Sequence, residues 1–224
     1  MTLDLSLPWQ VICGDNAEYL DALPRDAALV SDPPYGMAWN TDSSRFTGGR
    51  QGPAPRGRSR WSDIHGDDRP FDPTPWLAFD KVILWGANHY AQRLPVGTTL
   101  VWVKRNDHSF GTFLSDAEIG WVRGGYGVYC WREVFMAPRR MVENDGASAG
   151  HPTQKPVGLM RRCIERLTLA PDTLIVDPYC GSGTTGVAAV QMGYRFLGIE
   201  REPAYCAIAR RRIGDAAAQG RLAL

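Results

Sequence analysis

Short apolar runs alternate with amphipathic stretches over most of this 224-residue chain. The runs are rich in Val, Ile, Leu and aromatic residues and are bounded by turn-forming residues, which is typical of buried strands. We predict strands at residues 9–13, 27–31, 81–85, 98–103, 119–122, 174–176 and 195–199, with an antiparallel edge strand at 130–136. Helices are predicted at residues 16–23, 75–79, 88–94, 157–168, 184–192 and 203–218. This alternation favours an α/β fold with a parallel sheet.

One long segment, residues 37–73, interrupts the alternation. Its centre is rich in Gly, Pro and Arg and has almost no apolar residues, so we predict a mobile insertion within a single domain of residues 1–224. Because Arg binds phosphate through two parallel hydrogen bonds, the segment could grip a polyanion; a solubilising linker is the alternative. The arginines concerned are Arg45, Arg50, Arg56, Arg58 and Arg60, and Arg139 and Arg140 open a second, shorter loop.

Net charge, cysteines and histidines limit the partners and cofactors that the sequence favours. The formal net charge is +1, so a nucleic-acid partner would have to bind local basic patches. The five cysteines are scattered without a Cys-x-x-Cys pair, which indicates reduced thiols in a cytoplasmic protein. The four histidines form no ligand cluster, so we expect no metal. No signal peptide and no apolar run of membrane-spanning length is found, so we expect no membrane association.

The sequence Asp-Pro-Pro-Tyr at residues 32–35 directly follows a predicted strand. Two prolines end that strand and stiffen the corner, because proline lacks an N–H and fixes its own φ. The corner carries a carboxylate, a free proline carbonyl and an aromatic ring, at the strand end where open α/β sheets bind ligands. This set suits a planar substrate with an exocyclic amine. A proline-rich turn with a surface aromatic is the alternative.

A second candidate site lies in the predicted strand-helix-strand unit at residues 174–200. Gly181 and Gly183 allow a tight turn before a helix N-terminus, and Glu200 ends the next strand, where an acid can bind ribose hydroxyls. The Lys of a P-loop and the third glycine of a dinucleotide loop are missing. Asp177 suits an ammonium group, so the unit points to an aminoacyl nucleoside such as S-adenosylmethionine. A tight turn with a surface glutamate is the alternative.

Three motifs together resemble the DNA amino-methyltransferases: Asp-Pro-Pro-Tyr at 32–35, His-Pro-Thr-Gln-Lys-Pro at 151–156 and Asp-Pro-Tyr-Cys-Gly-Ser-Gly-Thr-Thr at 177–185. Their order, with the catalytic motif first and the cofactor glycines last, is similar to the permuted beta group. The resemblance covers nearly the whole chain outside the Arg-rich insertion. It implies a doubly wound, mostly parallel seven-stranded sheet of the Rossmann-like methyltransferase type. It also implies methyl transfer from S-adenosylmethionine to adenine N6 or cytosine N4 in DNA.

The resemblance assigns roles residue by residue. It implies catalytic roles for Asp32, Pro33 and Tyr35. The cofactor residues that it implies are Asp15, Lys155, Asp177, Tyr179, Gly181, Ser182, Gly183, Thr184 and Glu200. Residues 132–150 fall where the family carries its target-recognition segment, but they are few, so the arginines of the insertion and of this loop are the DNA-binding candidates.

Several alternatives remain open from the sequence. Asp rather than Ser at the start of the corner favours adenine N6 over cytosine N4 in this family. Release-factor glutamine methyltransferases use a related Asn-Pro-Pro-Tyr corner, so an RNA or protein amine or amide is an alternative acceptor. A nucleic-acid-binding module without activity is the alternative from another class. A homodimer and a restriction partner are compatible with the sequence, which does not give the recognition site.

Overall fold

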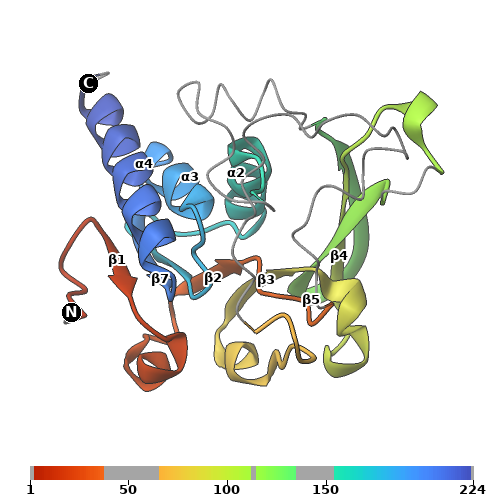
Figure 1. Ribbon diagram of the computed structural model, residues 1–224, viewed down its shortest axis with the longest axis horizontal. Helices are drawn as coiled ribbons and strands as arrows, with labels where there is room; N and C mark the ends of the chain where they lie inside the picture. Colours follow the sequence, from red (N-terminus) through yellow and green to blue (C-terminus); the bar gives the residue numbers. More distant parts are fainter. Residues whose placement is uncertain (1–2, 38–65, 112–114, 135–153, 223–224) are drawn as a thin grey trace, which may run out of the picture.

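The computed structural model describes residues 3–37, 66–111, 115–134 and 154–222. Seven strands form one sheet in the order β1-β7-β6-β2-β3-β5-β4 (Figure 1). The strands are β1 (Trp9–Cys13), β2 (Ala28–Ser31), β3 (Lys81–Trp85), β4 (Gly97–Val103), β5 (Ala117–Arg132), β6 (Leu174–Asp177) and β7 (Arg195–Glu200). Neighbours from β1 to β3 are parallel and β5 is antiparallel to β3. The predicted mostly parallel, seven-stranded α/β fold is confirmed.

In the described part of the chain, three α-helices cover one face of the sheet and short 3-10 turns cover the other (Figure 1). The helices are α2 (Val157–Arg166), α3 (Thr184–Gln191) and α4 (Pro203–Leu222). The turns are η1 (Asn16–Glu18), η2 (Leu20–Ala22), η4 (Thr74–Ala78), η5 (Ala87–His89), η6 (Ala91–Arg93) and η7 (Asp107–Ser109). The helices predicted at 16–23 and 88–94 are thus each a pair of 3-10 turns. In the second pair, Tyr90 separates the turns with a non-helical backbone (φ −137°, ψ 26°), and its buried hydroxyl donates to the Trp85 carbonyl at 2.5 Å.

The two faces of the sheet have separate hydrophobic cores, as the period-2 pattern of a strand requires. On β3, Ile83 and Trp85 pack with the helices, whereas Val82 and Leu84 pack with the 3-10 turns. All four side chains are fully buried. Strands buried on both faces explain why the sequence runs are continuously apolar rather than alternating. This burial fixes the carboxyl ends of the central strands at one edge, where the candidate site lies.

β5 is longer than the sequence suggested. The two strands expected at 119–122 and 130–136 belong to one element. Both halves of this element pair with β4, so that Val101 pairs with both Ile119 and Cys130. The chain reverses at Gly124 and Gly125, which have φ of 80° and 68°. The second half of β5 is parallel to β4, with Thr99 opposite Val128 and Val103 opposite Arg132. The prediction of an antiparallel edge strand was therefore wrong.

Most of the two predicted loops, 37–73 and 132–150, lies outside the described residues. The described end of the first one, residues 66–73, packs on the face covered by 3-10 turns, where the Phe71 ring meets Tyr90 and Tyr179 edge to face. The Asp67 carboxylate accepts hydrogen bonds from the N–H groups of Gly36 and Met37. Among the described residues, no helix is long and apolar enough to span a bilayer.

Candidate active site

Two Asp-Pro corners lie next to each other at the carboxyl edge of the sheet. Asp32 follows β2, and Asp177 ends β6, the strand paired with β2. The Ser31 hydroxyl donates to the Asp177 carboxylate at 2.6 Å and so joins the two corners. The sequence placed these residues 146 positions apart; the parallel pairing of their strands brings them together.

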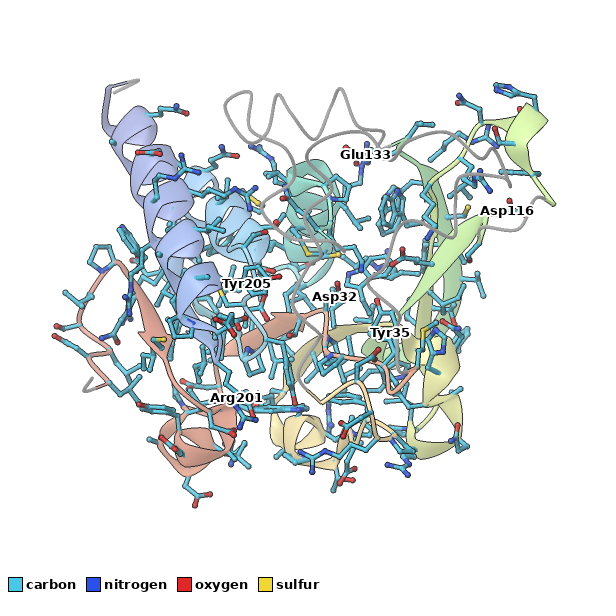
Figure 2. All side chains as sticks on the ribbon, in the orientation of Figure 1. Asp32, Tyr35, Asp116, Glu133, Arg201 and Tyr205 are labelled. Carbon is cyan, nitrogen blue, oxygen red and sulfur yellow. The ribbon has the colours of Figure 1, made fainter. Side chains whose placement is uncertain are left out.

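The Asp32 carboxylate is held on both oxygens. The Tyr35 hydroxyl donates to Oδ1 and the Lys155 ammonium to Oδ2, each at 2.5 Å. Figure 2 shows Asp32 and Tyr35 near the middle of the molecule. Burial raises the pKa of Asp32 above its usual value, against the opposing effect of Lys155. Even so, the Asp32 side chain keeps 20% of its surface exposed, so a substrate group can reach it.

Lys155 links Asp32 to two charged residues that the sequence did not single out. Its Nζ lies 2.9 Å from Oε2 of Glu118 on β5, and Lys104, just after β4, lies 2.8 Å from Oε1 of the same carboxylate. Burial alone would lower the pKa of Lys155, but Asp32 and Glu118 raise it to about 12. Burial alone would raise the pKa of Glu118, but Lys155 and Lys104 lower it to about 2. Lys155 and Glu118 are therefore both charged at neutral pH.

The Tyr35 ring is held flat against the turn after β3. It stacks on the exposed His89 ring, with centroids 5.0 Å apart and planes 12° apart. Gly86 lies beneath it with a φ of 75°, and a Cβ there would collide with the Tyr35 ring. Burial lowers the pKa of His89, so this imidazole is neutral at pH 7. The sequence analysis missed both residues, although Gly86 at a strand end was a visible turn signal.

The glycine loop between β6 and α3 is tightly built. Gly181 and Gly183 have positive φ values of 53° and 82°, and a Cβ on Gly183 would lie 2.9 Å from the Cα of Ala209. The Gly181 N–H donates to Oε2 of Glu200 at 2.7 Å, and Oε1 accepts from the Glu202 N–H. The Arg201 N–H also bonds this carboxylate. Glu200 thus ties the loop to the end of β7, and three of the four acceptor sites of its carboxylate are used.

A buried arginine supports this loop from behind. Arg212 on α4 donates from Nη1 to the Ser182 carbonyl at 2.7 Å, to the Ser182 hydroxyl at 3.0 Å and to the Thr184 hydroxyl at 3.2 Å. The side chains of Ser182 and Thr184 are therefore buried in the loop's support rather than open at the edge. A signal for Arg212 existed: it lies next to Ile213 on the helix face that also carries the buried Ala209 and Ala216.

The Asp177 carboxylate faces inward. It accepts hydrogen bonds from the Ser31 hydroxyl, the Thr185 hydroxyl and the Tyr179 N–H, and only 2% of the residue is exposed. Burial raises its pKa to about 6, because these hydrogen bonds compensate only part of the lost solvation. Asp177 shapes the loop from inside.

A family model for DNA methylases, N6_N4_Mtase, matches residues 80–211, more than half of the chain. The chain belongs to the DNA methylase family. The matched range includes Glu118, Lys155 and the glycine loop, whereas the Asp32 corner precedes it.

Curated relatives of this DNA methylase match over a short segment. The chain is 52% identical to the type II methyltransferase M2.DpnII of Streptococcus pneumoniae over 63 residues, which are 28% of this chain and 23% of the relative. It is 46% identical to the type II methyltransferase M2.LlaDCHI of Lactococcus lactis subsp. cremoris over 70 residues, 31% of this chain and 26% of the relative. The chain thus matches about a quarter of the length of these relatives.

Solved structures share the fold of this DNA methylase over almost its whole length. The M1.HpyAVI-SAM complex aligns with a TM-score of 0.53 and 18% identity, covering 92% of this chain and 98% of that one. The cytosine-N4-specific PvuII DNA methyltransferase aligns with a TM-score of 0.58 and 14% identity, covering 95% and 92%. At these identities the likeness concerns the fold alone.

The remaining predicted residues of this DNA methylase fall at different distances from the corner. Asp15 caps η1 through the Ala17 N–H, and Asn16 in η1 donates to the Pro178 carbonyl at 2.9 Å, so the turn after β1 contacts the loop that follows β6. The Tyr179 ring packs edge to face on Phe71 and Trp76. The predicted DNA-binding residues Arg45, Arg50, Arg56, Arg58, Arg60, Arg139 and Arg140 lie outside the described residues.

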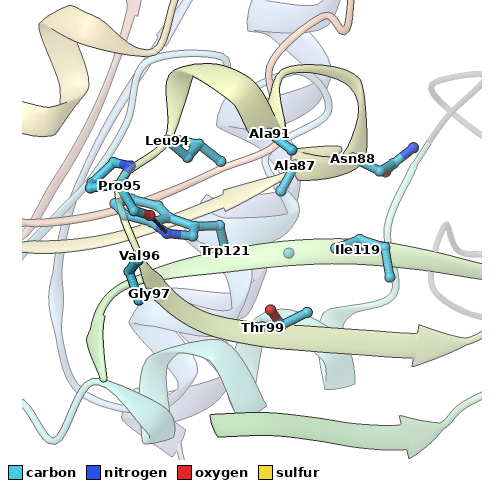
Figure 3. A pocket seen from close by; sticks show the side chains of 11 residues that line it. Ala87, Asn88, Ala91, Leu94, Pro95, Val96, Gly97, Thr99, Ile119 and Trp121 are labelled. Carbon is cyan, nitrogen blue, oxygen red and sulfur yellow. Dashed lines mark hydrogen bonds between the residues drawn. The ribbon is translucent and has the colours of Figure 1, made fainter. Parts of the chain in front are cut away.

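Two further features lie outside this cluster. A shallow hollow of about 250 Å³ lies between the η5–η6 turns and β4 and β5, and Leu94 and Trp121 are among its lining residues (Figure 3). Neither Asp32 nor the glycine loop lines it, so it is separate from the candidate site. Within the described ranges, no three His, Cys, Asp or Glu side chains are grouped as metal ligands.

Proposed function

We propose that this chain transfers a methyl group from S-adenosylmethionine to the exocyclic amine of a DNA base, with adenine N6 as the acceptor. One observation supports this proposal most: the charged Asp32 corner and the glycine loop adjoin at one sheet edge, joined by the bond between Ser31 and Asp177. A substrate amine at Asp32 would thus face a ligand on the loop. Family membership supports the same reaction.

The glycine loop fits the proposed cofactor. The positive φ at Gly181 and Gly183 brings backbone close to the edge, and the N-terminus of α3 behind it offers N–H groups to a carboxylate. Glu200 retains acceptor capacity for ribose hydroxyls, and Tyr179 adds an aromatic wall. These residues would hold the cofactor, which supplies an electrophilic methyl group on a sulfonium when it is bound.

The Asp32 corner would activate the amine by hydrogen bonding. An exocyclic amine is a poor nucleophile because its lone pair is delocalised into the ring. Asp32 and the Pro33 carbonyl each accept one of its hydrogens and favour a pyramidal nitrogen, whose lone pair is then free to react. The carboxylate also stabilises the positive charge that develops on the nitrogen. Positioning and electrostatics account for the catalysis, and a duplex base would have to flip out to reach the corner.

Adenine is the proposed acceptor because the corner begins with Asp rather than Ser, which in this family leans towards adenine. DNA contact is assigned to the arginines between Arg45 and Arg60, since they lie next to the corner in sequence. If they bind phosphates, alanine at Arg56, Arg58 and Arg60 will weaken DNA binding and flatten its salt dependence. An unchanged salt slope would make the segment a linker. Such an enzyme would work in the cytoplasm, in line with its free cysteines.

The decisive experiment offers methyl-labelled S-adenosylmethionine with DNA, RNA and protein as separate acceptors. We expect label in DNA alone. Digestion of that DNA to nucleosides, followed by mass spectrometry, should yield N6-methyladenine; N4-methylcytosine would correct the base but keep the reaction. Label found only in RNA or protein would refute the proposal. Sequencing of methylated bases would then give the recognition site.

A further inference from the structure

We propose that Glu118 on β5 is a positioning residue: it shares Lys155 with Asp32, so that the Asp32 carboxylate keeps its strength as a hydrogen-bond acceptor for the target amine. This inference rests on the proposed methyl transfer. None of the three sequence motifs contains Glu118, which is 86 residues from Asp32 in the chain. Its place in the site comes from the pairing of β5 with β3 next to β2.

The contacts of the Lys155 ammonium support this role. The Lys155 ammonium donates hydrogen bonds to Asp32 at 2.5 Å and to the Tyr35 hydroxyl at 3.2 Å, and it forms an ion pair with Oε2 of Glu118 at 2.9 Å. Two of these three groups belong to the Asp32 corner, and Glu118 comes from another part of the sheet. Lys155 is only 5% exposed, which leaves water little part in orienting it.

The charges in this row alternate in sign. From the corner outward they are Asp32, Lys155, Glu118 and Lys104, with the neighbours 2.5 to 2.9 Å apart. Without Glu118, the whole Lys155 charge would act on Asp32. The carboxylate would then be a weaker acceptor for the amine and a weaker base for the proton that the methylated nitrogen must lose. Glu118 shares that lysine and preserves the acceptor strength of Asp32.

This role predicts a pH effect that a purely structural role would not produce. The groups facing Asp32 are Tyr35 beyond β2, Tyr90 beyond β3, Glu118 on β5, Lys155 before α2 and Asp177 at the end of β6. Among these, the Glu118 charge acts to raise the pKa of Asp32 and the Lys155 charge to lower it. Removal of the Glu118 charge should therefore shift the titration of Asp32 to lower pH.

The test uses the full chain with Glu118→Gln, which keeps the shape and loses the charge. The titration of the Asp32 carboxyl is followed by carbon NMR and assigned with Asp32→Asn, and kcat for DNA methylation is measured against pH. We expect the carboxyl titration and the acidic limb of kcat both to move to lower pH. We also expect kcat at neutral pH to fall about tenfold, while the KM for DNA stays the same.

Asp116→Asn is the matched control, because it removes the same charge two residues away. Its carboxylate accepts from the Gly111 N–H, and Figure 2 shows it well apart from Asp32. It should leave both titrations in place. Should Glu118→Gln not fold, Glu118→Gln with Lys104→Gln removes the outer pair together and predicts the same shift.

The outcomes separate the two proposals. An Asp32 titration that does not move in Glu118→Gln would overturn the inference, and so would a kcat limb that stays while the carboxyl titration moves. Absence of DNA methylation by the unaltered chain would instead refute the proposed function. In that case the NMR comparison would still decide whether Glu118 controls Asp32.

Discussion

Asp32 and Asp177 begin two corners with nearly the same sequence, Asp-Pro-Pro-Tyr and Asp-Pro-Tyr, on neighbouring parallel strands. Their surroundings are opposite. Asp32 is paired with the Lys155 ammonium and keeps 20% of its side chain exposed. Asp177 has hydrogen-bond donors, the hydroxyls of Ser31 and Thr185 and the Tyr179 N–H, and is almost fully enclosed.

The difference shows how one motif serves two purposes. An Asp-Pro pair ends a strand and leaves a carboxylate at its tip, whatever that carboxylate does next. At β2 the carboxylate is paired with a cation and stays partly exposed, as the proposed role in substrate binding requires. At β6 the Asp177 carboxylate accepts hydrogen bonds from hydroxyl and backbone donors and so stabilises the glycine loop. The tyrosines differ likewise, since Tyr35 donates to Asp32 whereas the Tyr179 ring packs on Trp76.

The comparison is tested most strongly by Asp32→Ala. If Asp32 holds the amine, methyl transfer should fall about 10³-fold or more, because both the acceptor and its charge are lost. Binding of S-adenosylmethionine, measured by calorimetry, should persist, since the glycine loop is intact. Asp32→Asn keeps the shape and should also be inactive if the charge matters. Near-full activity of either variant would remove Asp32 from the mechanism.

Lys155→Met is expected to have the next largest effect, on stability. It leaves Asp32 and Glu118 without their shared cation, and removal of one partner of a buried ion pair costs about 3 kcal/mol. Urea unfolding measures this loss. Lys104→Met is the matched control, because Lys104 has 27% of its side chain exposed and should cost below about 1 kcal/mol. Equal losses of unfolding free energy in the two variants would mean that the buried Lys155 contributes no more to stability than the partly exposed Lys104.

Asp177→Asn should act in the opposite direction. The folded pKa of Asp177, about 6, lies above the ordinary value of 3.8, so the folded state binds this proton more tightly than the unfolded chain. The contribution of Asp177 to stability is therefore full below pH 3.8 and is lost as the pH rises through 6. Asparagine removes the buried charge and keeps the acceptor for Ser31.

The variant should thus be more stable than the unaltered chain at pH 8, by about 3 kcal/mol, and the gain should vanish towards pH 4. Thermal or urea unfolding at the two pH values measures it. A loss of stability at pH 8 would show that the ionised carboxylate is better solvated by its donors than its burial implies.

Much of the fold was predictable because hydrophobic pattern reports burial directly. The α2 stripe of Leu159, Met160, Cys163 and Ile164 is buried as its spacing predicted, and the unit from Leu174 to Glu200 was identified with its loop. The paired 3-10 turns were not predicted. They depend on local hydrogen bonds, such as the Asp15 cap at η1 and the bond of the buried Tyr90 hydroxyl to the Trp85 carbonyl, which helix propensity does not report.

The partners within the site were less predictable, because they come from distant parts of the chain. Lys155 was singled out, but its bond to Asp32 spans 123 residues, and periodicity has nothing to say about such a pair. Glu118 had one weak signal, a charge directly before the predicted strand at residues 119–122. The sequence assigned Asp32 and Asp177 to different motifs, but it did not show that one carboxylate is paired with an ammonium and the other is enclosed by hydroxyl and backbone donors, because these partners come from the tertiary structure.

His89→Ala should have the smallest effect, and it tests how far the stacking of His89 on Tyr35 contributes to the Asp32 corner. Tyr35 is fixed by its hydrogen bond to Asp32 and by stacking on His89. Loss of the His89 ring removes the stacking and leaves the hydrogen bond in place. An aromatic pair contributes about 1 kcal/mol, which predicts a fivefold or so fall in kcat/KM for DNA. His89→Phe keeps the stack and should retain activity. If His89→Phe is as impaired as His89→Ala, the imidazole nitrogens rather than the ring face contribute at the corner.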